Sequence, residues 1–248
     1  MAKTLDEIVL WARTVIGQQP WLRDPKCLPI PWRSVQPKKS LKIGVLWNDG
    51  LVTPTPPVAR ALSETVNKLK AAGHKIITWA PPEHKALLNT LSTMFLADGG
   101  KSVRKLLEPT KEPFRPEMQD YANATEIGVY AMWQIQLARN SLCKSYLDRW
   151  NEAGIDAVLC ILPLIRLMCL LTLSGPSTPY STVEHGKFAY VGYTGVFNVL
   201  DYPAVSFPCG VKTDKNMDAS YENHQPLSDI DARIQNDCQF SPADSVEC

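Results

Sequence analysis

The stretch Leu41–Trp79 constrains the fold most, because it has the pattern of a strand, a loop, a helix and a second strand. Leu41–Trp47 is an apolar run of strand length that ends in turn-forming residues. Apolar residues then recur at helical spacing after Thr55 and Pro56, which suit the start of a helix. Gly73 favours the end of that helix, and the apolar residues after it predict the second strand. Two strands joined by one helix predict a parallel sheet in an α/β protein.

The composition is typical of a globular protein and gives no sign of a nucleic-acid or membrane-surface partner. Hydrophobic residues make up 45% of the 248 residues, charged residues 21%, and the formal net charge is +1. The seven cysteines are an odd number without a C-x-x-C pair, so we expect no metal site and no cofactor. Reduced thiols, and an N-terminus without the pattern of a secretory signal, predict a cytoplasmic protein.

Before the central stretch, the sequence predicts a helix followed by a connection. Thr4 and Glu7 have the spacing of a capping box, and Gly17 favours the end of the helix. Proline and tryptophan dominate Pro20–Arg33, which we expect to be extended and to pack its two tryptophans. Binding of this segment to a proline-recognising partner is the alternative.

After the central stretch, three further elements are predicted. Pro81 and Pro82 precede a helix, Glu126–Ala153 has the apolar stripe of one long helix, and Ile155–Cys160 is a buried strand. The tetrapeptide Gly99-Gly100-Lys101-Ser102 is similar to the end of a phosphate-binding loop. It lacks the first glycine of that motif and the preceding strand, so it predicts a helix junction.

The last part of the chain contains one anomalous segment and a polar end. The apolar run Ile161–Leu173 is interrupted by Pro163 and Arg166 and is too short for a membrane span. Further on, the sequence predicts a short helix near Val196–Leu200 and a strand over Ala204–Phe207. From Lys212 onward the composition becomes polar and predicts loops or poor order.

Several motifs, in one order along the chain, resemble those of a known family. The most specific is Tyr193-Thr194-x-x-x-Asn198-x-x-Asp201-Tyr202-Pro203-Ala204-x-x-x-Pro208. This set is similar to the C-terminal half of the amidase-signature hydrolases, in particular their fungal acetamidase-like and fatty-acid-amide-hydrolase-like branch. The other matching stretches are Met1–Ile8, Pro20-Trp21-x-x-Asp24-Pro25, Ile30-Pro31-Trp32-Arg33, Gly44-Val45-x-x-x-Asp49-Gly50 and Gly73-His74.

The resemblance implies both a fold and a reaction. The fold is the C-terminal portion of an α/β/α sandwich with a mixed, largely parallel sheet. The family reaction is hydrolysis of a small-molecule carboxylic acid amide by a Ser–cis-Ser–Lys triad, with backbone N–H groups of a Gly/Ser-rich loop holding the oxyanion. Neither that loop nor any triad member has a counterpart between Met1 and Cys248. The resemblance therefore implies no catalytic residue in this chain.

Two positions carry over from the family as substrate-binding residues. In the fatty-acid-amide branch, residues just before and within the Tyr-Thr motif line the acyl pocket, and these are Val191 and Gly195 here. Gly195 has no side chain, so any wall it forms is wide or is supplied by a neighbour. A site made of a Ser or Cys with one of the scattered histidines, His74, His84, His185 or His224, stays open as an alternative. Of these histidines, His74 follows a helix-ending glycine and suits a capping role.

We expect residues 1–235 to form the C-terminal part of a single amidase domain and residues 236–248 to be a divergent polar tail. Residues 161–175 interrupt the resemblance, which resumes at Pro176. We interpret this insert as a translated intron, because its pattern matches neither an amphipathic helix nor a strand. A real buried helix lining a hydrophobic pocket is the alternative.

The sequence leaves three hypotheses for function. The first is an inactive C-terminal fragment of an amidase. The second is a non-catalytic chain that binds a complementing N-terminal amidase half. The third is a hydrolase with an unrecognised Ser/His or Cys/His site. The amide substrate and the oligomeric state do not follow from the sequence.

Overall fold

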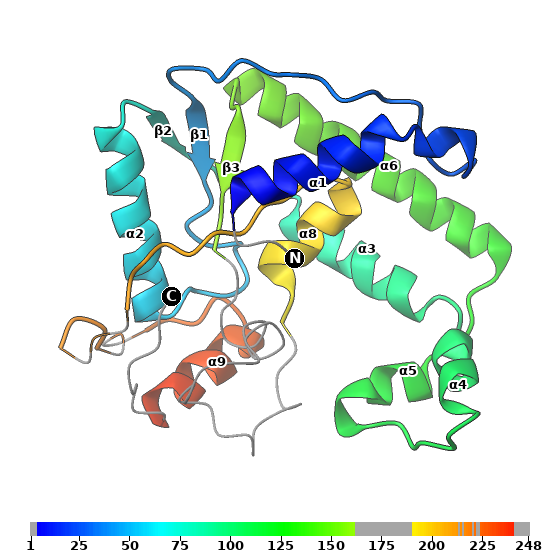
Figure 1. Ribbon diagram of the computed structural model, residues 1–248. Helices are drawn as coiled ribbons and strands as arrows, with labels where there is room; N and C mark the ends of the chain where they lie inside the picture. Colours follow the sequence, from blue (N-terminus) through cyan, green and yellow to red (C-terminus); the bar gives the residue numbers. More distant parts are fainter. Residues whose placement is uncertain are drawn as a thin grey trace. The chain divides into compact units, whose positions relative to one another are not determined.

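The computed structural model of the chain describes residues 4–161, 190–212, 214, 216–219, 221 and 224–240. The chain divides into two compact units, Met1–Lys39 and Ser40–Cys248. Figure 1 shows the helices and strands of both units. The single amidase domain predicted for residues 1–235 stays a prediction.

The first unit contains helix α1 (Leu5–Gly17) and the short 3-10 helix η1 (Pro20–Leu22). The predicted capping box is confirmed, because Glu7 N donates to Thr4 Oγ1 at 3.3 Å and Thr4 N donates to the Glu7 carboxylate at 3.1 Å. The prediction that the connection is extended is wrong for its first part, where η1 forms. Proline suits the first position of a helix, since its φ is already helical and its missing N–H would have no partner there.

The second unit is built on a three-stranded parallel sheet, as the sequence predicted. Its order is β2 (Lys75–Thr78), β1 (Lys42–Val45), β3 (Ala157–Leu159). In register, Ile43 lies beside Ile76 on one side and beside Ala157 on the other. Helix α2 (Pro56–Ala71) connects β1 to β2, and Gly73 follows it with φ +87°. Figure 1 shows α2 on the β2 side of the sheet and α6 (Val129–Ala153) on the β3 side.

The core joins the sheet to four helices, α2, α3 (His84–Leu96), α6 and α8 (Gly192–Leu200). Helix α3 contacts both α6 and α8. Each of these helices, and strand β1 with its following loop, supplies apolar side chains that are 2% exposed or less. They are Val45, Leu46, Val66, Leu87, Tyr146, Tyr193 and Val196. Burial of these groups is the main stabilising contribution to the unit. The predicted long helix begins at Val129 instead of Glu126, because Glu126 pairs with Asp98 in an isolated bridge.

The predicted helix junction at Gly99 and Gly100 is confirmed. Both glycines have positive φ, 65° and 73°, and α4 (Lys101–Leu107) begins directly after them. A Cβ at Gly100 would overlap the carbonyl oxygen of Tyr121, so only glycine fits there. The short helices η2 (Pro116–Met118) and α5 (Gln119–Asn123) follow in the proline-broken stretch.

Two predictions for the end of the chain are wrong. Ala204–Phe207 is not a strand, and its residues are exposed without regular secondary structure. No other described segment pairs with it, and a strand needs a neighbour to satisfy its backbone groups. Part of the polar end is a helix, α9 (Asp229–Phe240). Ser228 starts it by accepting a hydrogen bond from Asp231 N at 3.1 Å, a cap that polar composition concealed.

The segment 162–189 lies outside the described residues. It contains the predicted insert 161–175, apart from its first residue, and also His185. Among the helices of the described part, none combines the length and the apolar character needed to cross a bilayer.

Candidate functional site at the carboxyl end of the sheet

The candidate site lies at the carboxyl ends of β1 and β3. In an open parallel sheet, ligands bind at the carboxyl ends of the strands. They do so at the place where the connections from two adjacent strands run to opposite sides. The order β2-β1-β3 puts that place at β1. The loop after β1 carries Asp49. From residue 190 onward, the chain lies at the same place with Tyr190 and α8.

Asp49 organises the loop after β1. Its side chain is 6% exposed, and its Oδ1 accepts hydrogen bonds from Leu51 N and Val52 N, both at 2.9 Å. Its Oδ2 accepts a hydrogen bond from the hydroxyl of Tyr190, which lies 141 residues later in the chain. One buried carboxylate therefore fixes both the loop and the start of the α8 segment.

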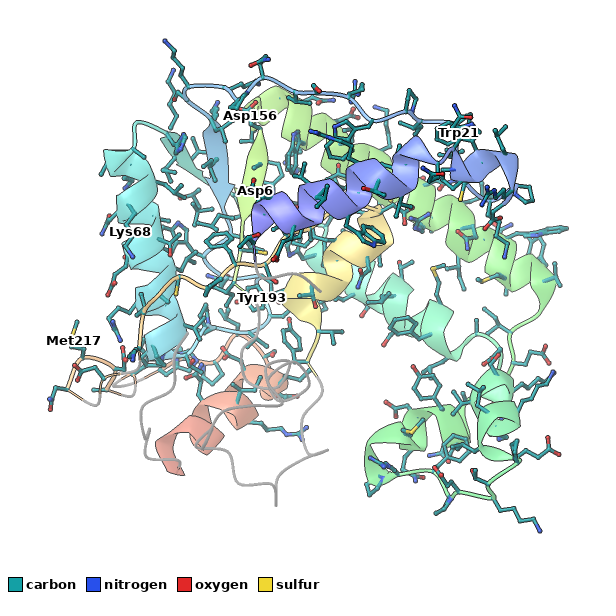
Figure 2. The ribbon with its side chains drawn as sticks, viewed as in Figure 1. Asp6, Trp21, Lys68, Asp156, Tyr193 and Met217 are labelled. Atoms are coloured by element: carbon teal, nitrogen blue, oxygen red, sulfur yellow. The ribbon has the colours of Figure 1, made fainter. Side chains whose placement is uncertain are left out.

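Two tyrosines face this loop from the α8 segment. Tyr190 bonds Asp49, and the hydroxyl of Tyr193, labelled in Figure 2, donates to the carbonyl oxygen of Val52 at 2.5 Å. Burial, followed by the charge or hydrogen bond of Asp49, raises the pKa of both phenols. Both phenols are therefore neutral donors. Gly192 allows this approach, because a Cβ there would overlap the Tyr190 phenol and come within 2.5 Å of the Asp49 carboxylate.

The two predicted substrate-binding residues lie at the start of α8, four residues apart. Val191 directly precedes the helix and is 47% exposed, whereas Gly195 is buried against α3. A Cβ on Gly195 would lie 2.6 Å from Leu91 Cδ2 and 3.4 Å from Leu88 Cδ2. The space beside Gly195 is thus filled by a neighbour, Leu91. A role of Val191 and Gly195 in lining an acyl pocket stays a prediction.

Sequence reasoning named His84, the first residue of α3, only as one of the scattered histidines and did not predict its burial. It is 1% exposed, and neither ring nitrogen has a hydrogen-bond partner among the described residues. Its ring stacks on that of Tyr146, with centroids 6.0 Å apart. Burial lowers the pKa of His84, and the charges of Asp49 and Glu83 oppose that shift. The imidazole is therefore held neutral. Its position after two prolines at a helix start was the only available signal.

A second buried carboxylate holds the other side of the loop. Asp231, on α9, is fully buried and accepts from Thr53 N at 3.0 Å, Thr53 Oγ1 at 2.9 Å and Leu227 N at 2.9 Å. His224 Nε2 lies 3.1 Å from the same carboxylate. The loop is thus held at Asp49 by the α8 segment and at Thr53 by α9.

The described histidines do not form a nucleophilic site. The His74 N–H donates to the carbonyl oxygen of Leu69 at 3.1 Å, which confirms the predicted capping role at the end of α2, and His74 Nδ1 accepts a hydrogen bond from Leu41 N at 3.2 Å. His224 pairs with Asp231, and the part of the chain that the structure describes offers His84 no hydrogen-bond partner. Among the described residues, none of the three bonds a serine or a cysteine. Burial also raises the pKa of the Cys160 thiol, at the end of β3, to about 11, which leaves it protonated.

The fold and the site define an α/β protein with a parallel sheet whose carboxyl end is closed by a helix from the C-terminal part of the chain. The chain belongs to the amidase family, whose model matches residues 1–226.

Known proteins with similar sequences and structures are amidases. An acetamidase of Emericella nidulans is 30% identical over 94% of this chain and 42% of its own length. A putative amidase of Schizosaccharomyces pombe is 32% identical over 100% of this chain and 44% of its own length. The structure of a fatty acid amide hydrolase superposes on 98% of this chain with a TM-score of 0.82 and 29% identity, over 42% of that protein. The chain therefore spans less than half of the length of the relatives it matches.

Proposed function

We propose that this chain forms the carboxylic acid amide-binding part of an amidase fold and does not hydrolyse amides by itself. The observation that carries the proposal is that the chain belongs to the amidase family, while the 248 residues contain no Gly/Ser-rich loop that matches the family's triad. The apolar side chain of Val191, which is 47% exposed beside this site, supports a role in binding a neutral substrate.

The physical reason is the loss of both parts of the catalytic machinery. Hydrolysis of an amide needs an activated nucleophile and preorganised donors for the oxyanion. Removal of the triad from such an enzyme leaves at best the rate provided by binding and the oxyanion hole, and here the loop that forms the oxyanion hole in the family has no counterpart either.

The test is release of ammonia by the purified chain from acetamide and from longer fatty amides. We expect the rate to equal that of a control without protein. Turnover that disappears when one serine or cysteine of this chain is replaced would overturn the proposal and favour the alternative of a Ser/His or Cys/His hydrolase.

A second candidate function is that of a partner-binding chain that complements an N-terminal amidase half. The observation that favours it is the extent of the match, since the relatives contain more than half of their length outside the matched region. Large apolar side chains are also exposed on α6, among them Tyr130, Trp133 and Leu137, which are each at least 59% exposed. Cys27, Cys143 and Cys160 form no disulfide within the described part of the chain, which supports a cytoplasmic location.

A further inference from the structure

The start of α3 carries most of the buried polar side-chain atoms that lack a hydrogen-bond partner. Among the described residues, these atoms are Trp32 Nε1, Glu83 Oε2 and both ring nitrogens of His84. Most of them therefore belong to two consecutive residues at one end of one helix. Native structures contain few such atoms, because burial removes them from water without a replacement bond. The start of α3 is thus a part of the core that gains polar partners when it opens to water.

Two side chains hold this start of α3 against α6. Glu83 Oε1 accepts hydrogen bonds from Ser145 Oγ at 2.8 Å and from Arg149 Nη2 at 3.1 Å. The His84 ring lies almost parallel to that of Tyr146, at an angle of 19°. Glu83 makes polar bonds to α6, whereas His84 contributes packing. A buried imidazolium without an acceptor is costly, so this packing requires an uncharged ring.

Helix α3 in turn supports the segment that closes the candidate site. It contacts α8 as well as α6, and Figure 1 shows it beside α8. Leu91, two turns after His84, fills the space beside Gly195 of α8. The α8 segment supplies the hydroxyl groups of Tyr190 and Tyr193 to the loop after β1. A movement of α3 is therefore transmitted to the site through α8.

The surroundings of His84 favour the neutral ring. Burial is the largest effect and lowers the pKa of His84, while the negative charges of Asp49 and Glu83 oppose that shift. The positive end of the helix dipole, at the first position of α3, also disfavours an imidazolium. Arg149 is bonded to Glu83 and offsets part of its negative charge. The charged or titratable groups on the elements packed around the ring are Asp49, Glu83, Tyr146, Arg149, Cys160, Tyr190 and Tyr193.

We propose that His84 is a pH switch for the candidate site. At neutral pH the uncharged ring packs on Tyr146, and α3 holds the α8 segment against the loop after β1. In mild acid the ring leaves this position and a ring nitrogen takes up a proton from solvent. The first turns of α3 then open, α8 loses its support, and the bond between Tyr190 and Asp49 loosens. The inference goes beyond the proposed function, because it concerns when the site is assembled and not what it binds.

The size of the effect follows from the titration of a single group. In the open form the ring lies in water and has the ordinary pKa of 6.5. The closed form binds the proton less readily, so a fall in pH favours the open form and a rise favours the closed form. One proton changes the ratio of open to closed chains by at most about tenfold between pH 7.5 and pH 5.5.

The experiment is hydrogen–deuterium exchange of the full 248-residue chain at pH 7.5, 6.5 and 5.5, with each rate corrected for the pH dependence of free peptides. We expect the corrected rates of residues 84–91 and 192–200 to rise about three- to tenfold between pH 7.5 and pH 5.5. Rates in β1 and α2 should change less than about twofold, because a local opening leaves them folded. A smaller rise at residues 84–91, or an equal rise in β1 and α2, would overturn the proposal.

Variants of single histidines assign the titration. His84→Phe keeps an aromatic ring on Tyr146 but cannot take up a proton, so its corrected rates at residues 84–91 should change less than about twofold over the same range. His84→Met gives the same test with a more adaptable side chain. His224→Gln is the matched control. It removes a histidine that pairs with Asp231 beside the same loop, and it should leave the rise intact.

The outcomes of this comparison are decisive in each case. A rise that persists in His84→Phe or His84→Met, or that disappears in His224→Gln, would assign the titration to another group and overturn the inference. If neither variant of His84 folds, the contrast between α3 and β1 in the unmodified chain still decides. Ammonia release by the chain tests the proposed function separately, since it is measured at one pH and does not depend on exchange.

Discussion

The indole Nε1 of Trp79, at the end of β2, donates a hydrogen bond of 2.9 Å to the hydroxyl of Tyr146 on α6. Both side chains are buried, and their rings meet edge-on with centroids 5.6 Å apart. The bond joins the sheet to the long helix at the centre of the core. It also explains why Tyr and not Phe occupies position 146.

We expect Tyr146→Phe to destabilise the second unit by about 1–3 kcal/mol, because it leaves a buried donor without an acceptor. The measurement is urea unfolding followed by tryptophan fluorescence. Tyr130→Phe is the matched control, since Tyr130 lies on the same helix and is 72% exposed. Equal stabilities of the two variants would show that the buried bond contributes nothing.

Replacement of Gly195 tests whether Leu91 fills the space beside it. Gly195→Val should destabilise the unit by about 1–3 kcal/mol, because its Cβ would lie 2.6 Å from Leu91 Cδ2. Gly195→Val combined with Leu91→Ala should recover part of that loss, since the smaller side chain leaves room. Gly128→Ala is the control, because no described residue other than its two chain neighbours lies within 4 Å of a Cβ there. Losses that simply add would mean that the two positions do not compete for space.

His84 makes the stability of the unit depend on pH. Burial lowers its folded pKa below the ordinary value of 6.5, so the unfolded chain binds a proton at a pH where the folded chain does not. Stability should therefore be fully present above pH 6.5 and fall as the pH drops from 6.5 toward the lower folded pKa. Carboxylates contribute to this fall only at lower pH, where Asp and Glu titrate.

His84→Phe should flatten this part of the pH profile. Phenylalanine keeps the stacking on Tyr146 and removes two buried nitrogens that bond none of the described residues, so we expect no loss of stability at pH 7. Thermal unfolding between pH 5 and pH 7.5 measures both effects. An unchanged pH dependence in His84→Phe would assign the titration to another group.

Asp231 anchors α9 to the loop after β1. Asp231→Ala removes the acceptor for Thr53 N, Thr53 Oγ1 and Leu227 N, so we expect a loss of about 2–4 kcal/mol, since each hydrogen bond to a charged group contributes ~1.5–3 kcal/mol and their losses are not additive. Limited proteolysis should then cut near residues 224–240. Asp229→Ala is the control, because Asp229 is exposed in the same first turn. Similar proteolysis of both variants would contradict the anchoring role.

The sequence predicted the elements whose signals are local. The capping box at Thr4 and Glu7, the helix end at Gly73 and the junction at Gly99 each depend on backbone preferences within a few residues. The parallel sheet also followed from a local pattern, because β1, α2 and β2 are consecutive. Fold class was therefore predictable from one short stretch.

The errors occur where a distant contact decides the conformation. Ala204–Phe207 has the composition of a strand but lacks a described neighbour. Residues 229–240 have the composition of a loop, yet Thr53 and Ser228 hold Asp231 in a helix. In the site, the motif residues Val191 and Gly195 were found by resemblance, whereas the bond between Asp49 and Tyr190 spans 141 residues and has no sequence signal.

The order of strands in the sheet has a consequence for synthesis of the chain. β1 pairs on one side with β2, which begins 33 residues later. On its other side it pairs with β3, where Lys42 N donates a hydrogen bond to Asp156 Oδ2, 114 residues later. At translation rates of about 5–20 residues per second, the ribosome needs roughly 6–23 s to supply those residues. During this interval the central strand of the finished protein is an edge strand, and its unpaired side is open to chaperones or to a neighbouring nascent chain.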